Sequence, residues 1–312
     1  MTRREALGGL GWIVAGRAAQ TPAPGPTRFQ IGCLTLPYSP FPLERALEGI
    51  ARSGCRYLGF GTRHLQKPLL EVSAPASEAA RLAEQARQRG LTPLMMFSTV
   101  SVEAPDSVPA HWRRIEQAAA ARIPYLLTFG STKPGQRDLW ISNLRQLAPR
   151  ALDSGVTLVI KPHGGNTATG ADCLRIVEEV GSAGLKICYD AGNVLDYQNV
   201  DPIPDMQACA GEVRAFTIKD HRNTPRDEDC GPGFGEIDHY KLLAPVARTG
   251  REMPLLCENI FEPLSPRPKT PEQVDELARR AREFLETVTR GLATLAGGPR
   301  KLSLQPPLSS AG

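Results

Sequence analysis

Eight short apolar runs, separated by stretches with helical periodicity, constrain the fold of this chain more than any other feature. The runs are almost continuously apolar and show little alternation, as expected of strands buried on both faces. They read FQIGCLTLP, YLGFGT, TPLMMFS, YLLTFG, TLVIKP, KICYD, VRAFTIKD and PLLCENI, and begin near Phe29, Tyr57, Thr92, Tyr125, Thr157, Lys186, Val213 and Pro254. Between the runs, apolar residues recur with helical spacing, for example at Leu43, Ala46, Leu47 and Ile50.

This alternation predicts an α/β chain of the (β/α)8 TIM-barrel class. Eight strand and helix units fit into about 260 residues, a usual length for such a barrel. A doubly wound open sheet is the alternative, and it is disfavoured because no G-x-G-x-x-G motif follows the first run. We expect residues 1–27 to form an export signal and Pro-rich leader, residues 28–290 the barrel, and residues 291–312 a flexible C-terminal tail.

Composition limits the classes of function. The formal net charge is only +4, and the arginines near the N-terminus supply most of it, so no footprint for nucleic acid remains. The seven cysteines form no C-x-x-C pair and fall mostly within apolar runs, so we expect them to be reduced and buried. His111 and His239, two of the five histidines, stand at expected helix starts, where surface or capping positions are predicted.

The N-terminal stretch MTRREALGGLGWIVAGRAAQTPAPGP combines the pair Arg3 and Arg4 with an apolar segment and small residues. It resembles a twin-arginine export signal, which implies a periplasmic or exported protein. A leader on a cytoplasmic protein is the alternative. The apolar segment is too short to span a bilayer as a helix, so we expect no integral membrane segment in the mature chain.

Polar residues follow the apolar runs at the ends where a barrel carries its chemistry. They are Arg63 and His64 after the second run, Lys161 and His163 after the fifth, Asp190 and Asn193 after the sixth, Lys219, Asp220 and His221 after the seventh, and Glu258 and Asn259 after the eighth. Side chains alternate along a strand, so Lys161 and His163 share one face, as do Lys219 and His221. We therefore predict that the last four strands aim two acids, two lysines and two histidines at one pocket.

The long segment HRNTPRDEDCGPGFGEIDHY is expected to form a loop on the same face. Arg222 and Arg226 in this loop are candidates for contacting a hydroxyl-rich or anionic substrate, the alternative being a solvated surface run. Strand parity makes Asp220 a structural partner of the loop. His64 is a candidate for substrate binding, with a position outside the pocket as the alternative.

The stretches KPHGGNTATG, CYDAGN, FTIKD, GPGFGEID and CENI resemble the xylose isomerase-like TIM barrels, a superfamily of sugar isomerases, epimerases and related enzymes. The resemblance covers roughly residues 28 to 290 and specifies no substrate. In that family a divalent metal, commonly Mn²⁺, Mg²⁺ or Zn²⁺, lies between an acid of strand 5, an aspartate of strand 6, a histidine of strand 7 and a glutamate of strand 8.

This chain keeps two of those four positions. The resemblance aligns Asp190 and Glu258 with the acids of strands 6 and 8, whereas Lys161 replaces the acid of strand 5 and Thr217 the histidine of strand 7. Asn193 replaces a histidine that is common after the strand-6 aspartate. An ammonium group beside two carboxylates would fill the electrostatic role of the metal.

A metal is the alternative to that ammonium group. Nitrogen and oxygen atoms of Asp190, Glu258, His163 and His221 could reassemble around Zn²⁺ or Mn²⁺. The sequence leaves the cofactor undecided between a lysine cation and a divalent ion.

These residues lead to a hypothesis of a sugar isomerase or epimerase that abstracts a proton α to a carbonyl group. Lys161 would polarise the carbonyl oxygen, and Glu258 or His163 would move the proton, beside Asp190. The candidates for substrate binding are His64, Asn193, Lys219, His221 and Arg222. The alternatives are a lyase or hydratase acting on a keto-sugar or keto-glycoside, and a catalytically silent sugar-binding barrel. The expected partner is a small-molecule carbohydrate, and a homo-oligomer is left open.

Overall fold

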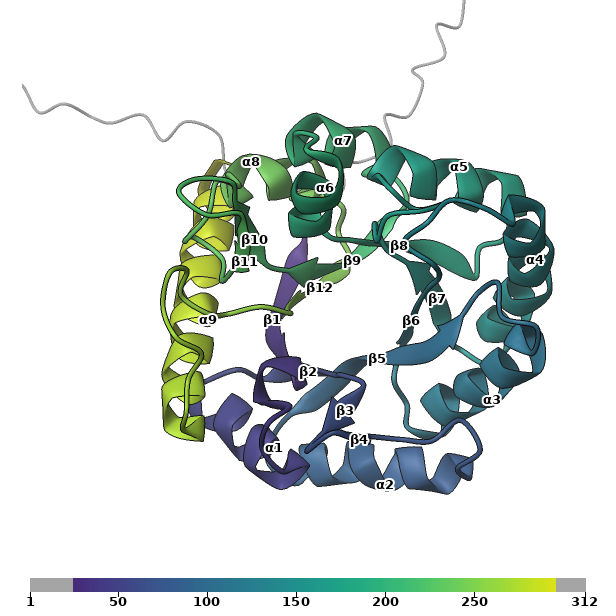
Figure 1. The fold of residues 1–312 in the computed structure, drawn as a ribbon, viewed down its shortest axis with the longest axis horizontal. Helices are drawn as coiled ribbons and strands as arrows, with labels where there is room; N and C mark the ends of the chain where they lie inside the picture. The colour runs from purple at the N-terminus through teal and green to yellow at the C-terminus, as the bar shows by residue number, and fades with distance from the viewer. Residues whose placement is uncertain (1–24, 296–312) are drawn as a thin grey trace, which may run out of the picture.

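Eight parallel strands close into a barrel in the computed structural model, which describes residues 25–295 (Figure 1). The order of the strands around the barrel is β1-β12-β9-β8-β7-β6-β5-β2. These strands are β1 (Arg28–Leu34), β2 (Tyr57–Phe60), β5 (Thr92–Ser101), β6 (Tyr125–Phe129), β7 (Thr157–Ile160), β8 (Leu185–Tyr189), β9 (Val213–Ile218) and β12 (Glu252–Cys257). Each strand coincides with one of the apolar runs, so the predicted (β/α)8 barrel is confirmed.

Helices surround this barrel and connect its strands (Figure 1). They are α1 (Leu43–Arg52), α2 (Ala76–Arg87), α3 (Ser107–Ala120), α4 (Arg137–Asp153), α5 (Gly170–Val180), α6 (Ala191–Gln198), α7 (Pro202–Cys209), α8 (His239–Leu243) and α9 (Pro271–Leu295), with 3-10 turns η1 (Leu36–Tyr38) and η2 (Ala244–Val246). Helix α9 continues past residue 290, where the sequence predicted a tail to begin. The predicted export signal and most of the predicted tail lie outside the described residues.

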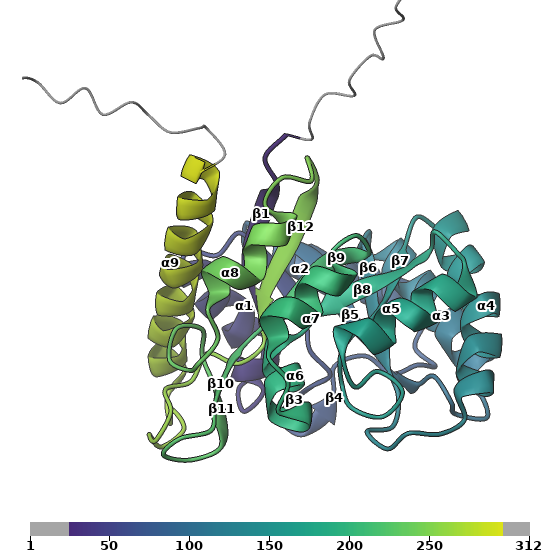
Figure 2. The ribbon, with the colours of Figure 1, turned by 90° about the horizontal axis from the view of Figure 1, so that it is seen from above.

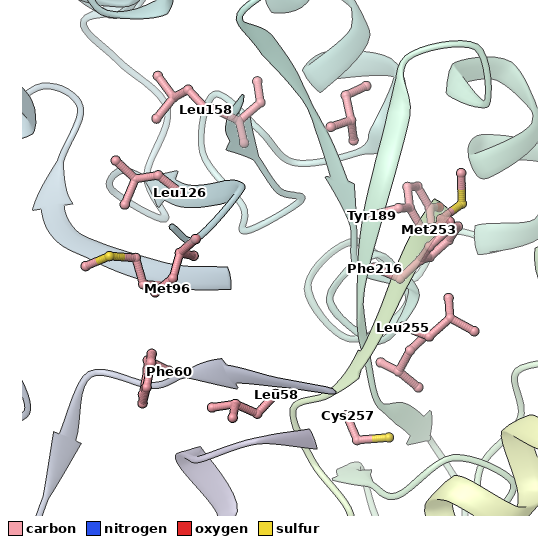
Figure 3. Packing of buried hydrophobic residues seen from close by; sticks show 14 of the residues in the cluster. Leu58, Phe60, Met96, Leu126, Leu158, Tyr189, Phe216, Met253, Leu255 and Cys257 are labelled. Carbon is pink, nitrogen blue, oxygen red and sulfur yellow. The ribbon is translucent and has the colours of Figure 1, made fainter. Parts of the chain in front are cut away.

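Alternating side chains of the strands fill two separate apolar regions. The inner region occupies the barrel and consists of Leu34, Met95, Phe97, Leu127, Val159, Cys188, Ala215 and Leu256. The outer region lies between the barrel and the helices. Leu126, Leu158, Phe216 and Leu255 belong to it (Figure 3). In the β6–β7 register Leu126 pairs with Leu158, both in the outer region, and Leu127 pairs with Val159, both in the inner region. The same two strands therefore contribute side chains to both regions.

Short elements gather at one end of the barrel, beyond the C-terminal ends of its strands (Figure 2). They include α6 and the two hairpins β3 (Arg63–His64) with β4 (Lys67–Pro68) and β10 (Asp220–Arg222) with β11 (Glu228–Cys230). The buried carboxylate of Asp220 accepts hydrogen bonds from the backbone N–H groups of Gly233 and Ile237, both at 3.1 Å. The expected role of Asp220 as a partner of the long loop is therefore confirmed.

Two histidines depart from their predicted surface positions. His111 is fully buried, with Nε2 2.8 Å from Thr128 Oγ1 and Nδ1 2.8 Å from the Ser107 carbonyl oxygen. His239 is also buried and packs edge-on against Phe284. His239 is the first residue of α8 and His111 the fifth of α3. The N-caps are Asp238 and Asp106, and both histidines face the core, so the prediction of surface or capping positions is wrong.

The seven cysteines are all buried and free, as predicted. Burial raises the pKa of thiols such as Cys33 and Cys257, so these groups stay protonated and pack as small apolar residues. Among the described helices, none combines the length and the apolar composition that crossing a bilayer would require.

Candidate active site

The barrel interior changes from apolar to charged at the C-terminal ends of strands β7, β8 and β12. Lys161, Asp190 and Glu258 each stand two positions after a residue of the inner apolar region. Those preceding residues are Val159, Cys188 and Leu256. Because every second side chain of a strand points the same way, the three charged side chains continue the inward-facing rows. They meet at the end of the inner apolar region that lies nearest the C-terminal ends of the strands.

Lys161 forms an ion pair with each of the two acids. Its Nζ atom donates hydrogen bonds to Asp190 Oδ2 at 2.8 Å and to Glu258 Oε2 at 2.7 Å. Lys161 and Asp190 are almost completely buried, at 2% and 0% exposure, whereas the side chain of Glu258 is 16% exposed. Solvent therefore reaches this charged triad from the side of Glu258.

The charges of the triad stabilise one another. Burial by itself disfavours the ammonium form of Lys161, but the adjacent Asp190 and Glu258 carboxylates outweigh it and raise the lysine pKa above its ordinary value. Burial likewise disfavours the Asp190 carboxylate, but the Lys161 charge outweighs it and lowers the pKa of Asp190. Lys161 is thus a permanent cation at neutral pH, which excludes it as a general base or an amine nucleophile.

Asp190 is fixed by three different elements. It is the N-cap of α6, with Oδ1 accepting from the backbone N–H of Asn193 at 3.0 Å. Its Oδ2 accepts from Thr217 Oγ1 of β9 at 3.0 Å as well as from Lys161. The side-chain amide of Asn193 donates to the Pro162 carbonyl oxygen at 2.7 Å. Asn193, a predicted substrate-binding residue, thus ties α6 to the end of β7.

His163 lies in an aromatic cluster beside the triad. Its ring centroid is 4.7 Å from that of Phe129 and 5.8 Å from that of Tyr197. The Nδ1 atom is buried and has no hydrogen-bond partner among the described residues. Burial and then the Lys161 charge lower the pKa of His163 to about 4, so the ring is neutral at pH 7. A neutral imidazole can accept a proton there.

Sequence reasoning missed the aromatic residues of this cluster. Phe129 stands two positions after the inward-facing Leu127, so strand parity was a usable signal for it. Tyr197 stands four residues after Asn193 on α6, and only the orientation of that helix brings its ring within 6.0 Å of Lys219 Nζ. Phe97, on β5, lies with its ring 5.9 Å from Lys161 Nζ.

Next to the triad lie Lys219, which follows β9, and His221 of β10. Lys219 Nζ forms an ion pair with the carboxylate of Asp229. Burial opposes the lysine charge, but Asp190 and Asp229 outweigh it, so the pKa of Lys219 is raised. The aliphatic stem of Lys219 packs over Gly192, where a Cβ atom would lie 2.5 Å from the lysine Cγ. His221 Nδ1 lies 3.2 Å from Asp229 Oδ1.

The remaining predicted residues are not gathered with the triad. His64 is buried in β3, which lies near β2 and β5 in Figure 1, with Nδ1 2.9 Å from the Phe41 carbonyl oxygen. Arg222 donates to the Thr224 carbonyl oxygen within its own loop, at 2.7 and 2.9 Å. Arg226 forms an ion pair with Glu228.

The donor set at the centre of the barrel does not fit a divalent metal. The Lys161 ammonium already lies between the two carboxylates that would hold the ion, and it would repel a second cation. In the part of the chain that the structure describes, the one group of three metal-ligating side chains with ligand atoms within 4.8 Å of one another is Asp196, His221 and Asp229. The four predicted ligands are therefore not brought together as a set.

The fold and this charged mouth define a (β/α)8 barrel with polar groups at the C-terminal ends of its strands, the end at which such barrels carry their sites. A family model for the xylose isomerase-like TIM barrel matches residues 47–287. The chain belongs to this family. Among curated proteins, no sequence matches the chain significantly.

Solved structures share the fold at low sequence identity. A D-allulose 3-epimerase from Methylomonas sp. has a TM-score of 0.65 and 17% identity, with coverage of 85% of this chain and 99% of that one. A probable 3-DHS dehydratase from Bacillus anthracis has a TM-score of 0.61 and 12% identity, with coverage of 83% and 98%. A fusion of a xylose isomerase-like barrel with 4-hydroxyphenylpyruvate dioxygenase has a TM-score of 0.67 and 17% identity. The match covers 91% of this chain but 47% of the fusion protein.

Proposed function

We propose that this protein is a sugar isomerase or epimerase in which the Lys161 ammonium group takes the place of a metal ion. The observation that carries the proposal is the position of Lys161 Nζ, 2.8 Å from Asp190 Oδ2 and 2.7 Å from Glu258 Oε2. These bonds use two of the three N–H donors of a lysine. The third is available for an oxygen atom of a substrate.

The reaction begins with removal of a proton from the carbon next to the carbonyl group of the sugar. The electron pair of the broken C–H bond forms the double bond of an enediolate, and the carbonyl oxygen becomes an oxyanion. A preorganised cation stabilises that charge without reorganising, which is why such groups contribute factors of about 10² or more to the rate. Lys161 meets this requirement because Asp190 and Glu258 hold it in place.

Glu258 and His163 are the candidate proton carriers. Asp190 is excluded because its carboxylate is fully buried and accepts from Lys161, Thr217 and Asn193. Glu258 is partly exposed and uses Oε2 for Lys161. Its other oxygen accepts no hydrogen bond from a described residue. Delivery of a proton to the opposite face by the second carrier gives an epimer. Delivery to the neighbouring carbon, with the hydroxyl proton passing to the oxyanion, gives an isomer.

Dehydration is the second candidate because it shares the first step. The probable 3-DHS dehydratase among the structural neighbours favours it. If the abstracted proton passes instead to the hydroxyl group on the next carbon, that group leaves as water, and the unsaturated product absorbs ultraviolet light. Epimerisation and isomerisation give no such product, so the products of one reaction mixture separate these candidates.

The proposal is tested by hydrogen exchange with a panel of ketopentoses and ketohexoses in deuterated water, followed by proton NMR. We expect the wild-type protein to exchange the α proton of at least one sugar, and Lys161→Met to lower that rate by about 10² or more. Lys186→Met is the matched control, since Lys186, which is partly buried at the start of strand β8, is likewise paired with an acid, Glu212. We expect it to retain the wild-type rate.

Two results would overturn the proposal. One is an unchanged exchange rate in Lys161→Met for the sugar that the wild type turns over. The other is tight binding of a sugar by the wild type without any exchange, which marks a binding protein. Circular dichroism of Lys161→Met shows whether a low rate reflects unfolding. Lys161→Arg, which keeps the charge and moves it, is expected to fold and still to lose activity.

A further inference from the structure

A second cluster of charged side chains lies beside the triad, on elements that do not carry Lys161. Asp196 belongs to α6, His221 to β10 and Asp229 to β11, and their ligand atoms lie within 4.8 Å of one another. His221 and Asp229 are direct partners in the antiparallel β10–β11 register, which holds them side by side. Helix α6 packs against both strands and adds Asp196. We call these three residues the rim cluster.

The imidazole of His221 has one buried nitrogen atom that is available to a ligand. His221 is 1% exposed, and its Nε2 atom is buried without a hydrogen-bond partner among the described residues. Asp227 Oδ1 lies 3.3 Å from Nε2 in a geometry that makes no hydrogen bond. A buried polar atom left without a partner costs about 1–3 kcal/mol, so native sites usually supply one.

The charges around the rim cluster favour a cation. Asp196, Asp227 and Asp229 surround His221, and the ammonium group that contacts them is Lys219, paired with Asp229. Three carboxylates against one ammonium leave two negative charges uncompensated. Arg226 is neutralised by its own pair with Glu228, and Arg222 donates to a backbone carbonyl oxygen of its loop rather than to one of these carboxylates.

The centre of the barrel has a different balance. Asp190 and Glu258 carry two negative charges there, and the Lys161 ammonium bonds to both, so one negative charge remains uncompensated. A divalent ion therefore meets an ammonium group already in place at the centre and a more anionic site at the rim. The contrast places a metal site away from the position at which related barrels hold theirs.

We propose that Asp196, His221 and Asp229 bind one first-row divalent cation, Zn²⁺ or Mn²⁺, at the mouth of the barrel. An imidazole nitrogen with two carboxylate oxygens is a donor set that these ions accept. Bonds of about 2.1 Å place neighbouring ligand atoms about 3–4 Å apart, so small side-chain rotations bring the three onto one ion. Three protein ligands leave coordination positions open to water or to an oxygen of a bound sugar.

The test measures ion binding, so it is independent of the reaction proposed above. Chelator-treated full-length protein is titrated with Mn²⁺ and followed by electron paramagnetic resonance, and with Zn²⁺ by calorimetry. We expect one ion per chain, displaced competitively by the other metal. Asp196→Asn is expected to weaken binding by about tenfold or more. Asp196 accepts no hydrogen bond from the described part of the chain, so this variant should fold.

Two control variants, each of which removes one carboxylate outside the rim cluster, locate the ion. Asp153→Asn removes one carboxylate at the far end of α4 and is expected to leave the affinity unchanged. Glu258→Gln removes an acid of the central triad and is expected to retain the bound ion as well. Asp229→Asn gives a second ligand variant, which is expected to lose binding like Asp196→Asn.

Three outcomes would overturn the rim site. They are the absence of Mn²⁺ and Zn²⁺ binding at millimolar concentrations, binding that survives in both Asp196→Asn and Asp229→Asn, and binding that disappears in Glu258→Gln while Asp196→Asn retains it. The last outcome would place the ion at the centre of the barrel.

Discussion

Lys161 is buried between two carboxylates, and its removal leaves two negative charges facing each other. Removing one partner of a buried ion pair typically costs about 3–5 kcal/mol, because the desolvated partner keeps its charge or must take up a proton. Asp190 has no route to solvent, since it is fully buried, accepts a hydrogen bond from Thr217 and is the N-cap of α6. The cost of losing Lys161 should therefore depend on pH.

In the wild-type protein the lowered pKa of Asp190 contributes stability above the unfolded value of about 3.9, and the contribution is lost as the pH falls through the folded pKa. The raised pKa of Lys161 contributes below the unfolded value of about 10.4, and that contribution is lost as the pH rises through the folded pKa. Between about pH 5 and pH 9 both contributions are present, and the ion pair adds no pH dependence of its own.

In Lys161→Met the contribution of Asp190 to stability depends on pH in the opposite direction. Without the ammonium, burial raises the folded-state pKa of the carboxyl group, so the variant binds an extra proton when folded and loses stability as the pH rises. We expect the free energy of unfolding to fall by about 3–5 kcal/mol at pH 8 and by clearly less at pH 5. Urea unfolding at both pH values measures the difference. An equal loss at pH 5 and pH 8 would mean that the acids are not desolvated by the fold.

His163 gives a second pH-dependent expectation. Burial and Lys161 lower its pKa to about 4, so the fraction of neutral imidazole stays constant from pH 8 down to about pH 5 and falls only below that. If His163 carries the proton, deuterium exchange should weaken near pH 4 and show no inflection at the ordinary histidine value of about 6.5. An inflection near 6.5 that disappears in His163→Gln would contradict this environment of the ring.

The loop between β9 and α8 depends on one close approach between its backbone and Asp220. A Cβ atom on Gly235 would lie 2.3 Å from Asp220 Oδ1 and 2.4 Å from the His221 carbonyl oxygen. Asp220 is itself held by the N–H groups of Gly233 and Ile237, so neither neighbour can move away freely. Position 235 therefore requires glycine, because the space beside Asp220 cannot hold a Cβ atom.

Gly235→Ala is therefore expected to lower the free energy of unfolding by about 1–3 kcal/mol, the usual cost of overpacking a well-packed site. Gly211→Ala is the matched control, because a Cβ atom there meets nothing within 4 Å, and it should change stability by less than about 0.5 kcal/mol. Thermal unfolding of both variants provides the comparison. Equal melting temperatures would show that the loop adjusts its backbone around the added methyl group.

Elements of the barrel were predictable to different degrees. The eight runs identified the strands because parallel strands buried on both faces leave continuous apolar sequence. Strand parity also placed Lys161 on the inner face, because the side-chain period of a strand is fixed. The burial of His111 was not predictable, since its partner Thr128 lies on a different element and no local pattern marks the contact. Tyr197 and Asp196 were missed for the same reason, because the orientation of α6 is set by tertiary packing.

At the scale of the whole molecule, the mouth of the barrel has two charged regions: a centre in which the Lys161 ammonium lies between two acids, and a more anionic rim. The family pattern in the sequence showed which ligands were replaced, and those substitutions alone could not show where negative charge remains. The rim cluster depends on how the β10–β11 hairpin folds back over α6, which is a long-range arrangement. Lys219 connects the two regions, since its ammonium pairs with Asp229 and its charge acts on Asp190.

Chelation distinguishes the roles of these two regions. If Lys161 stabilises the oxyanion, protein stripped with a chelator should still exchange the α proton of its sugar, because no ion takes part in that step. Loss of a rim ion, whose open positions face the mouth, should instead raise the sugar concentration required for the half-maximal rate. The measurement is deuterium exchange against sugar concentration before chelation, after it, and after restoring Mn²⁺. An exchange reaction that stops on chelation and returns with Mn²⁺, at every sugar concentration, would assign the electrophile to the ion and contradict the role of Lys161.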